Sequence, residues 1–182
     1  LSVKWATCNV GAESPEDYGD YFAWGETQPK DVYDWSTYKW CNGSYNTQTK
    51  YCTSNNYGIV DNKTILETID DAATVNLGAN WRMPTDVEIT ELREQCTWTW
   101  TTLNGVNGYK VVGRNGKSIF LPAAGFYNDS SLNLAGSRGY YWSSTTYINF
   151  SYTAYYLLFL SDYVERNYFH RYHGHSIRPV CP

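Results

Sequence analysis

The stretch Asn80-Trp81-Arg82-Met83-Pro84-Thr85-Asp86-Val87-Glu88 contains a helix start that organises the middle of the chain. The hydroxyl of Thr85 can accept a main-chain N–H of the first turn, and Glu88 stands three residues later, where its carboxylate can bond back. Asp86 and Glu88, the two acidic residues of this first turn, also suit the positive end of the helix dipole. We therefore predict a helix from this point toward Cys96, with Val87 and Leu92 facing the interior.

A first helix is predicted just before this stretch. Thr64 and Glu67 have capping-box spacing, and the apolar residues that follow recur at helical intervals. These residues are Ile65, Leu66, Ile69, Ala72 and Ala73. Gly78 would end the helix, because glycine readily adopts the left-handed conformation found just past many helix ends.

The rest of the chain has the pattern of strands, turns and loops. Strands are predicted over residues 97–101, 109–112, 117–121, 140–143, 154–160 and 175–180, and residues 1–6 also alternate like a strand. Reversals are expected at Asn104-Gly105, Asn107-Gly108 and Asn115-Gly116. Residues 11–58 are rich in Gly, Asp, Ser, Asn and aromatics, which predicts loops with short hairpins. The sequence thus predicts one α+β domain over residues 1–182.

The composition excludes several functional classes. The chain is 42% hydrophobic and 18% aromatic, with 18 Tyr and 8 Trp against one Met, which favours sheets and flat contact surfaces over helix bundles. The net charge is -4 and no basic stripe is apparent, so binding to nucleic acid is not expected. A negatively charged domain is also not attracted to an anionic membrane. No apolar run approaches the roughly 18 residues of a spanning helix, so direct membrane insertion is not expected.

The five cysteines are an odd number, so at least one is expected to stay unpaired in the monomer. Cys41 and Cys52 sit in similar contexts, as expected for the two arms of a hairpin, and are the best candidate pair for a disulfide. No Cys-x-x-Cys occurs, and the spacings do not resemble a zinc site.

The last forty residues, 143–182, differ in composition from the rest. They contain no Lys, Gln, Met or Trp and a single Glu, whereas residues 1–142 hold 26 residues of these five types. Tyr offers a large rigid contact and Ser, Asn and Gly offer adaptable hydrogen bonds, which is the composition of a binding surface. The alternative is a Tyr-rich β-region that lacks long side chains by chance.

Several blocks of sequence resemble a known fold. The stretch of residues 80–88 resembles the Trp-Arg-Leu-Pro-Thr-x-x-Glu signature of the C-type-lectin-like fold of formylglycine-generating enzymes and their non-catalytic relatives. Other blocks resemble bacterial surface domains of the major paralogous type: residues 5–12, 21–26, 121–125, 140–144 and 176–180. The resemblance spans almost the whole chain and implies an α+β fold with two helices, short antiparallel sheets, long loops and paired N- and C-terminal strands.

Proteins with this arrangement resemble the variable proteins of diversity-generating retroelements. In those systems a reverse transcriptase substitutes adenines in the C-terminal coding segment. Substitution of the two adenines of an Asn codon can give every amino acid except Lys, Gln, Glu, Met and Trp. These five types are the ones missing from residues 143–182, save Glu165. The resemblance implies a scaffold over residues 1–142 and a variable ligand-binding region over residues 143–182, on a bacterial cell surface or a phage particle.

The strand predicted at residues 154–160 is apolar on both faces. One face carries Tyr155, Leu157 and Phe159, and the other carries Tyr156, Leu158 and Leu160. Only one face is core in a sheet that is exposed on one side, so our hypothesis is that the second set faces a ligand. The alternative is a central strand that is covered on both sides.

Catalytic and metal chemistry find little support in the residues. The three histidines, His170, His173 and His175, are interpreted as contact residues, because only Asp162 and Glu165 are nearby acids that could complete a metal site. The Glu-Pro-Asn, Gln-Pro-Asp and Trp-Asn-Asp tripeptides of calcium-dependent lectins are absent. The cysteine pair of the enzymatic relatives is also absent. We expect neither an enzyme nor a cofactor.

We interpret the Trp-rich first half as structural, with Trp81 and Trp142 in the core and Arg82 and Arg178 bound to carbonyls or acidic loops. The predicted function is noncovalent recognition of a protein or glycan on a cell surface. The alternative is a structural or adhesive domain of a bacterial surface assembly. The candidate contacts are Tyr147, Asn149, Phe150, Tyr152, Tyr156, Leu158, Leu160, Asp162, Tyr163, Asn167, Tyr168, His170, Tyr172, His173 and His175.

Overall fold

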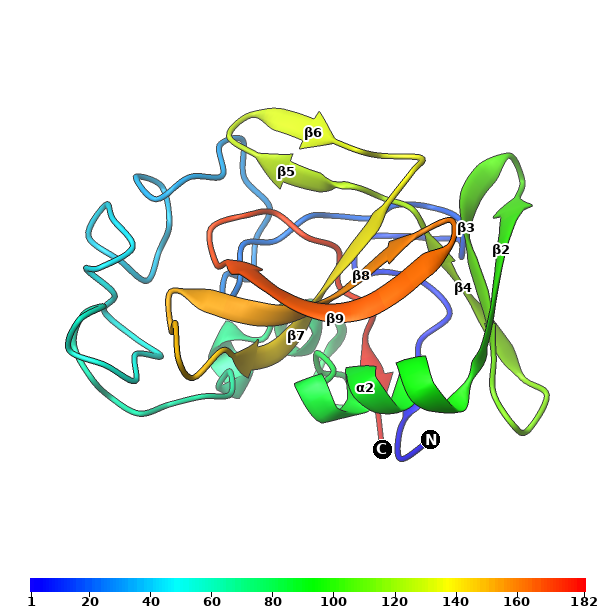
Figure 1. Cartoon of the computed structure of the whole chain (residues 1–182), viewed down its shortest axis with the longest axis horizontal. Helices are drawn as coiled ribbons and strands as arrows, with labels where there is room; N and C mark the ends of the chain where they lie inside the picture. The colour runs from blue at the N-terminus through cyan, green and yellow to red at the C-terminus, as the bar shows by residue number, and fades with distance from the viewer.

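The computed structural model describes all 182 residues and centres on a three-stranded antiparallel sheet (Figure 1). The sheet has the order β7-β8-β9, with β7 at Gly139–Thr146, β8 at Thr153–Leu160 and β9 at Tyr163–His170. The central strand, β8, pairs along its whole length with β9 and from Ala154 onward with β7. Our prediction missed β9, because its polar Glu165-Arg166-Asn167 segment reads as a loop.

A second antiparallel sheet, β2-β3-β4, lies beside the first. It consists of β2 at Thr97–Leu103, β3 at Val106–Val112 and β4 at Ser118–Pro122. The reversals predicted at Asn104-Gly105 and Asn115-Gly116 are confirmed. The one predicted at Asn107-Gly108 is wrong, because Gly108 lies inside β3. A Cβ at Gly108 would stand 2.2 Å from the Leu121 carbonyl oxygen, so glycine permits close strand pairing there instead of a turn.

The two ends of the chain pair, as predicted. β1, at Lys4–Trp5, is antiparallel to β10, at Val180–Cys181. A further short hairpin consists of β5 at Phe126–Asn128 and β6 at Ser131–Asn133. The strand predicted over 175–180 is largely replaced by isolated bridges, such as the one between Phe22 and His175.

The predicted helix start at Thr85 is confirmed. The helix α2 runs over Asp86–Gln95, and the Thr85 hydroxyl accepts from the Glu88 N–H while the Glu88 carboxylate accepts from the Thr85 N–H at 2.8 Å. Leu92 is buried as predicted, but Val87 is 75% exposed. The buried face is set by Ile89 and Leu92, and Val87 lies two residues before Ile89, roughly on the opposite side of the helix.

The first helix is shorter than predicted. A 3-10 turn, η1, covers Thr68–Asp70, and α1 begins at Ala72 and ends at Leu77. The cap of α1 is Asp71, whose carboxylate accepts from the Thr74 N–H. The carboxylate of Glu67 instead binds Lys50 and Lys63, so the predicted capping box with Thr64 does not form. Gly78 ends the helix as predicted, with φ at 91°.

The β7-β8-β9 sheet separates the two largest core clusters. On one face Trp142, Ala154 and Tyr156 pack with Trp24 and Phe22. On the other face Leu157 and Phe159 pack against α2 and the second sheet, in a cluster that includes Ile89, Leu92 and Tyr109. The sheet is therefore buried on both sides over much of its length.

The residues predicted as structural are mostly in the interior. Trp142 is fully buried and Trp81 is half-buried. Arg178 is buried and donates to the carbonyls of Ala6, Thr7 and Phe120, as predicted. Arg82 pairs with Glu88 at 2.8 Å and also donates to the Met83 carbonyl.

All five cysteines are free, so the predicted bridge between Cys41 and Cys52 is wrong. The backbone of Cys41 forms an isolated antiparallel β-bridge with Gln48, and the Cys41 thiol donates to the Trp35 carbonyl oxygen. The Cys52 thiol donates to the Ser54 carbonyl oxygen. Neither of the two helices has the length and apolar character needed to cross a membrane.

Candidate binding surface

The outward-facing set predicted on β8 does not form a surface. Tyr156 is 4% exposed and stacks on Tyr140 with ring centroids 5.7 Å apart. Leu158 and Leu160 are only partly exposed, and Leu158 packs against the same cluster. The alternative of a central strand covered on both sides is therefore correct for most of β8.

His173 and His175 are also buried, contrary to the prediction that they are contact residues. His175 is stacked on Trp142 with centroids 3.8 Å apart, and His173 is stacked on Phe169 at 4.1 Å. Burial holds the pKa of His175 well below its ordinary value and lowers that of His173 to about 3. Both rings are therefore neutral at pH 7 and act as flat core side chains.

The remaining aromatic candidates, except Tyr163, meet on one surface at one end of the sheet. Tyr147 and Tyr168 are stacked with centroids 4.2 Å apart, and Phe150 lies against both of them. Tyr152 links Phe150 to His170, because its ring centroid lies 6.0 Å from that of Phe150 and 5.7 Å from that of His170. Phe150 is 38% exposed and Tyr168 is 41% exposed, so these side chains face solvent.

Three aromatic side chains from the first half of the chain extend this group. The rings of Tyr45 and Tyr57 pack on Tyr152 with centroids 5.2 and 4.9 Å away. Trp35 packs on Tyr172 with ring centroids 4.9 Å apart. The loop that carries Tyr45 and Tyr57 lies beside the β7–β8 turn (Figure 1). We call the whole group the aromatic surface; it consists of Trp35, Tyr45, Tyr57, Tyr147, Phe150, Tyr152, Tyr168, His170 and Tyr172.

Sequence reasoning missed the three first-half members because it assigned the Trp-rich first half to the core. A signal was present for two of them. Tyr45 and Tyr57 stand in the turn segments Asn42-Gly43-Ser44 to Asn46 and Asn55-Asn56 to Gly58, where a large aromatic side chain has no strand or helix to bury it. Aromatic residues in such segments are candidates for contact residues.

Arg171 fixes the loops under the aromatic surface, although it lies inside the segment predicted to be variable. Its guanidinium is 0% exposed and donates to the carbonyls of Ser151 at 2.7 Å, Lys50 at 3.0 Å and Tyr51 at 3.1 Å. Its Nε donates to the Tyr38 hydroxyl at 2.8 Å. One side chain thus joins the β7–β8 turn to the loop that carries Tyr45 and Tyr57.

The other predicted contacts lie apart from the aromatic surface, except for Asn149. Asn149 is exposed in the β7–β8 turn, where its amide donates to the Tyr147 hydroxyl at 3.1 Å. Asp162 and Tyr163 are exposed at the opposite end of β9, and the amide of Asn167 donates to Glu165 at 2.9 Å. The structure therefore brings together roughly half of the predicted set.

A comparison with known protein families finds one family whose model matches more than half of the chain. Residues 73–180 match the model of a family described as a domain of unknown function, DUF8237. The chain belongs to this family. Neither the curated proteins nor the solved structures contain a match.

The DUF8237 segment includes every strand from β2 to β9 and the C-terminal members of the aromatic surface. Trp35, Tyr45 and Tyr57 lie before it. The aromatic surface of this member is therefore composite, with one side from the DUF8237 segment and the other from the preceding loops.

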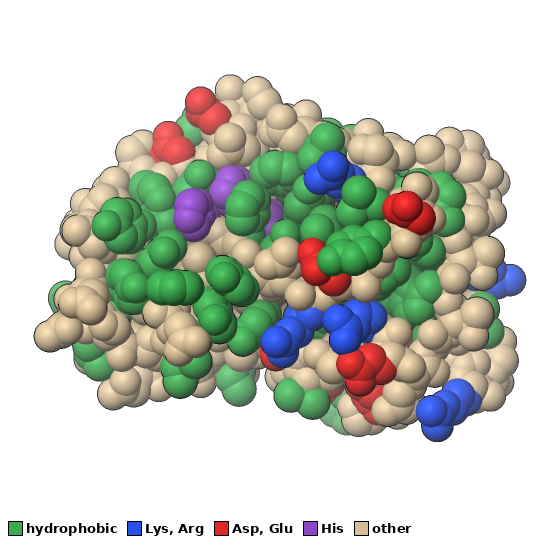
Figure 2. Space-filling view, in the orientation of Figure 1, with side chains coloured by type: hydrophobic (Ala, Val, Ile, Leu, Met, Phe, Trp, Pro, Cys, Tyr) green, Lys and Arg blue, Asp and Glu red, His purple; other side chains and the backbone are tan.

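The aromatic surface of this DUF8237 member carries no ion pair of its own. The ion pair of Arg166 with Asp86, whose atoms are 2.8 Å apart, lies beside it, because the Arg166 guanidinium stacks over Tyr155 and Tyr155 packs on Tyr147. Figure 2 shows hydrophobic side chains gathered around the histidines on the left half of the visible face. No group of three His, Cys, Asp or Glu side chains converges to hold a metal ion. The surface offers aromatic rings and hydroxyl groups for contact.

Proposed function

We propose that the protein recognises a protein or glycan on a cell surface, noncovalently, through the aromatic surface. The observation that carries the proposal is the continuity of this surface, in which exposed and partly exposed rings from two distant parts of the chain are in contact. Exposed aromatic clusters of this kind are unusual on a protein that binds nothing, because large aromatic side chains supply most of the contact energy in interfaces.

We further propose that the domain has the C-type-lectin-like fold and is a variable protein of the diversity-generating type, on a bacterial cell surface or a phage particle. The paired terminal strands, the two helices and the short antiparallel sheets agree with that fold. The missing Lys, Gln, Met and Trp of residues 143–182 agree with diversification of adenines.

The burial pattern narrows which positions can vary under this proposal. Exposed positions such as Asn149, Phe150 and Tyr168 can change without loss of the core. Arg171 and His175 are 0% exposed and must stay constant. Sequencing this gene from several isolates tests the idea. Differences confined to the exposed positions support it, whereas uniform drift along the chain, or frequent change at the buried positions, contradicts it.

Binding is tested with a glycan and surface-protein array probed with the purified domain. For any ligand found, Phe150→Ala and Tyr168→Ala together should weaken binding by a few kcal/mol, the effect of removing two aromatic anchors. Tyr163→Ala is the matched control, because Tyr163 is equally exposed but lies at the far end of β9. A ligand whose affinity responds to Tyr163 and not to the other two would place the site elsewhere.

A second candidate is a structural or adhesive domain that packs against a neighbour in a surface assembly. It is favoured by exposed aliphatic side chains in and next to η1 and α1, namely Ile65, Ile69, Val75 and Leu77. If this is the main role, Ile69→Ser should disrupt the assembly, and Tyr168→Ala should leave it intact.

A further inference from the structure

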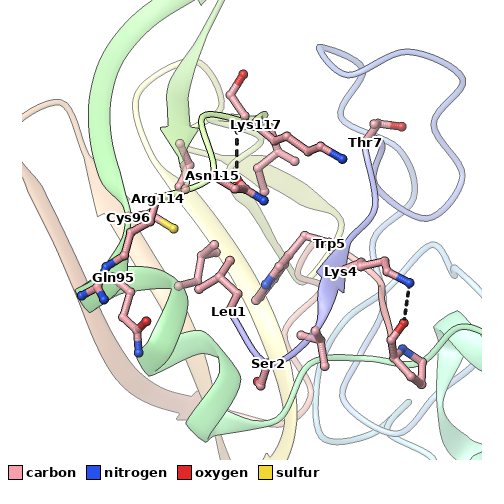
Figure 3. Close-up of a pocket in the computed structure, with 17 residues that line it drawn as sticks. Leu1, Ser2, Lys4, Trp5, Thr7, Gln95, Cys96, Arg114, Asn115 and Lys117 are labelled. Atoms are coloured by element: carbon pink, nitrogen blue, oxygen red, sulfur yellow. Dashed lines mark hydrogen bonds between the residues drawn. The ribbon is translucent and has the colours of Figure 1, made fainter.

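A pocket of about 660 Å³ lies away from the aromatic surface and shares no residue with it. It is bounded by the N-terminal strand, the last turn of α2 and the β3–β4 hairpin (Figure 3). Its apolar lining includes Val3, Trp5, Leu92, Val111 and Ile119. Pockets that take small molecules commonly measure roughly 300–1,000 Å³ and have mostly apolar walls with a few polar groups.

The charged side chains that line this pocket are all cationic. They are Lys4, Arg114 and Lys117, and no Asp or Glu is among the lining residues, although the whole chain has a net charge of -4. Lys4 donates to the Pro182 carbonyl oxygen at 3.1 Å, whereas Arg114 and Lys117 are exposed and have no ion pair. Clefts lined by one sign of charge attract ligands of the opposite sign.

The carboxylate of Glu91, close to the N-terminal residues, forms no ion pair with Lys4, Arg114 or Lys117. The carboxylate of Glu91 accepts from the main-chain N–H and the hydroxyl of Ser2, at 2.9 and 2.6 Å, and this hydrogen bonding lowers its pKa. Figure 3 shows Lys117 on the side of the pocket toward Thr7, and Arg114 on the side toward Gln95. A bound anion can therefore be approached from either side by a long, flexible cation.

The indole nitrogen of Trp5 is an unpaired donor on a residue that lines the pocket. It is shielded from solvent and has no hydrogen-bond partner. An indole N–H can only donate, and leaving such a donor unpaired costs about 1–3 kcal/mol. Figure 3 shows the Trp5 ring beside the exposed Leu1 side chain, within the group of lining residues. A ligand oxygen would reach this donor only after the side chains that cover it shift.

We propose that this pocket binds a small apolar molecule that carries one carboxylate. The apolar body would lie against Trp5, Leu92 and Ile119, and the carboxylate would bind Lys117 or Arg114. A neutral molecule would leave both cations unused, and a cation would be repelled by them.

The proposal is tested by calorimetry on the whole chain with octanoate and with octylammonium, which share the same apolar tail and differ in charge. Octanoate should bind and octylammonium should not. The place of binding is read from alkylation of Cys96, a lining residue, followed by peptide mass mapping. Octanoate should slow alkylation of Cys96 but not of Cys8, which does not line the pocket. Equal binding of the two probes, no binding of octanoate, or no protection of Cys96 would overturn the proposal.

Charge variants give a separate test. Replacing both cations, Arg114→Gln with Lys117→Gln, should weaken octanoate binding at least about tenfold, as expected when a charge-assisted hydrogen bond is lost. Both side chains are exposed and unpaired, so the fold should be unaffected. Lys110→Gln is the matched control, because Lys110 is exposed on the same hairpin outside the pocket. Unchanged affinity in the double variant would contradict the proposed role of the cations.

Discussion

Two groups of Tyr and His residues in the C-terminal part of the chain have the same composition and opposite surroundings. Tyr147, Tyr168 and His170 are partly or fully exposed, whereas Tyr156 and His175 lie in the core. The first group touches other exposed rings, and the second stacks on Tyr140 and Trp142. A tail rich in contact-forming residues therefore contains its own scaffold, and composition alone does not separate the two.

The largest effect is expected at Arg171, which joins the β7–β8 turn to the loop that carries Tyr45 and Tyr57. Arg171→Met should lower the free energy of unfolding by roughly 4–6 kcal/mol, because three main-chain carbonyls and the Tyr38 hydroxyl lose their donor in the interior. Chemical denaturation measures this change. Arg114→Met is the control, since that side chain is exposed and unpaired, and its effect should stay within about 0.5 kcal/mol. Equal effects of the two variants would contradict the role given to Arg171.

The buried histidines should make the fold sensitive to acid. In the unfolded chain His173 takes up a proton near its ordinary pKa of 6.5, but in the folded protein only near pH 3. Between these values the unfolded state binds more protons, so stability falls as the pH is lowered. His173 alone should remove roughly 4 kcal/mol over this range. Denaturation curves at pH 7, 5 and 4 for wild type and His173→Phe provide the test, and the variant should lose less stability. Parallel pH profiles would show that His173 is not buried as a neutral ring.

A direct contrast between the two groups comes from single tyrosines. Tyr156→Ala should cost about 3–4 kcal/mol, the usual effect of deleting a large aromatic side chain from a core. Tyr168→Ala should cost less than about 1 kcal/mol, because Tyr168 is 41% exposed and packs only on other surface rings. Urea denaturation of the two variants gives both values. A larger loss for Tyr168 than for Tyr156 would reverse the assignment of inside and outside.

Local signals predicted parts of the fold well. The capping box at Thr85 and Glu88 and the turn at Asn104-Gly105 depend on neighbours in sequence, and both are present. The spacing of Thr64 and Glu67 is equally local, but Glu67 pairs with Lys50, which is far away in the chain. A contact of that range leaves no mark in the sequence pattern.

The candidate site was harder to predict for the same reason. A strand that is apolar on both faces, such as residues 154–160, does not indicate which face is covered. His173 and His175 are polar by type, and only their stacking partners, Phe169 and Trp142, make them core residues. The exposed rings of the β7–β8 turn were predictable, because residues 147–152 combine aromatics with Asn and Ser between two strands.

The central claim is that the aromatic surface tolerates exchange of its side chains while the buried group beneath it does not. Two displayed libraries test it most directly, one randomised at Tyr147, Phe150, Tyr152 and Tyr168 and the other at Tyr156, Arg171, His173 and His175, with protease resistance as the measure of folding. We predict that most members of the first library resist the protease and that few members of the second do. Equal survival of the two libraries, or better survival of the second, would contradict the account.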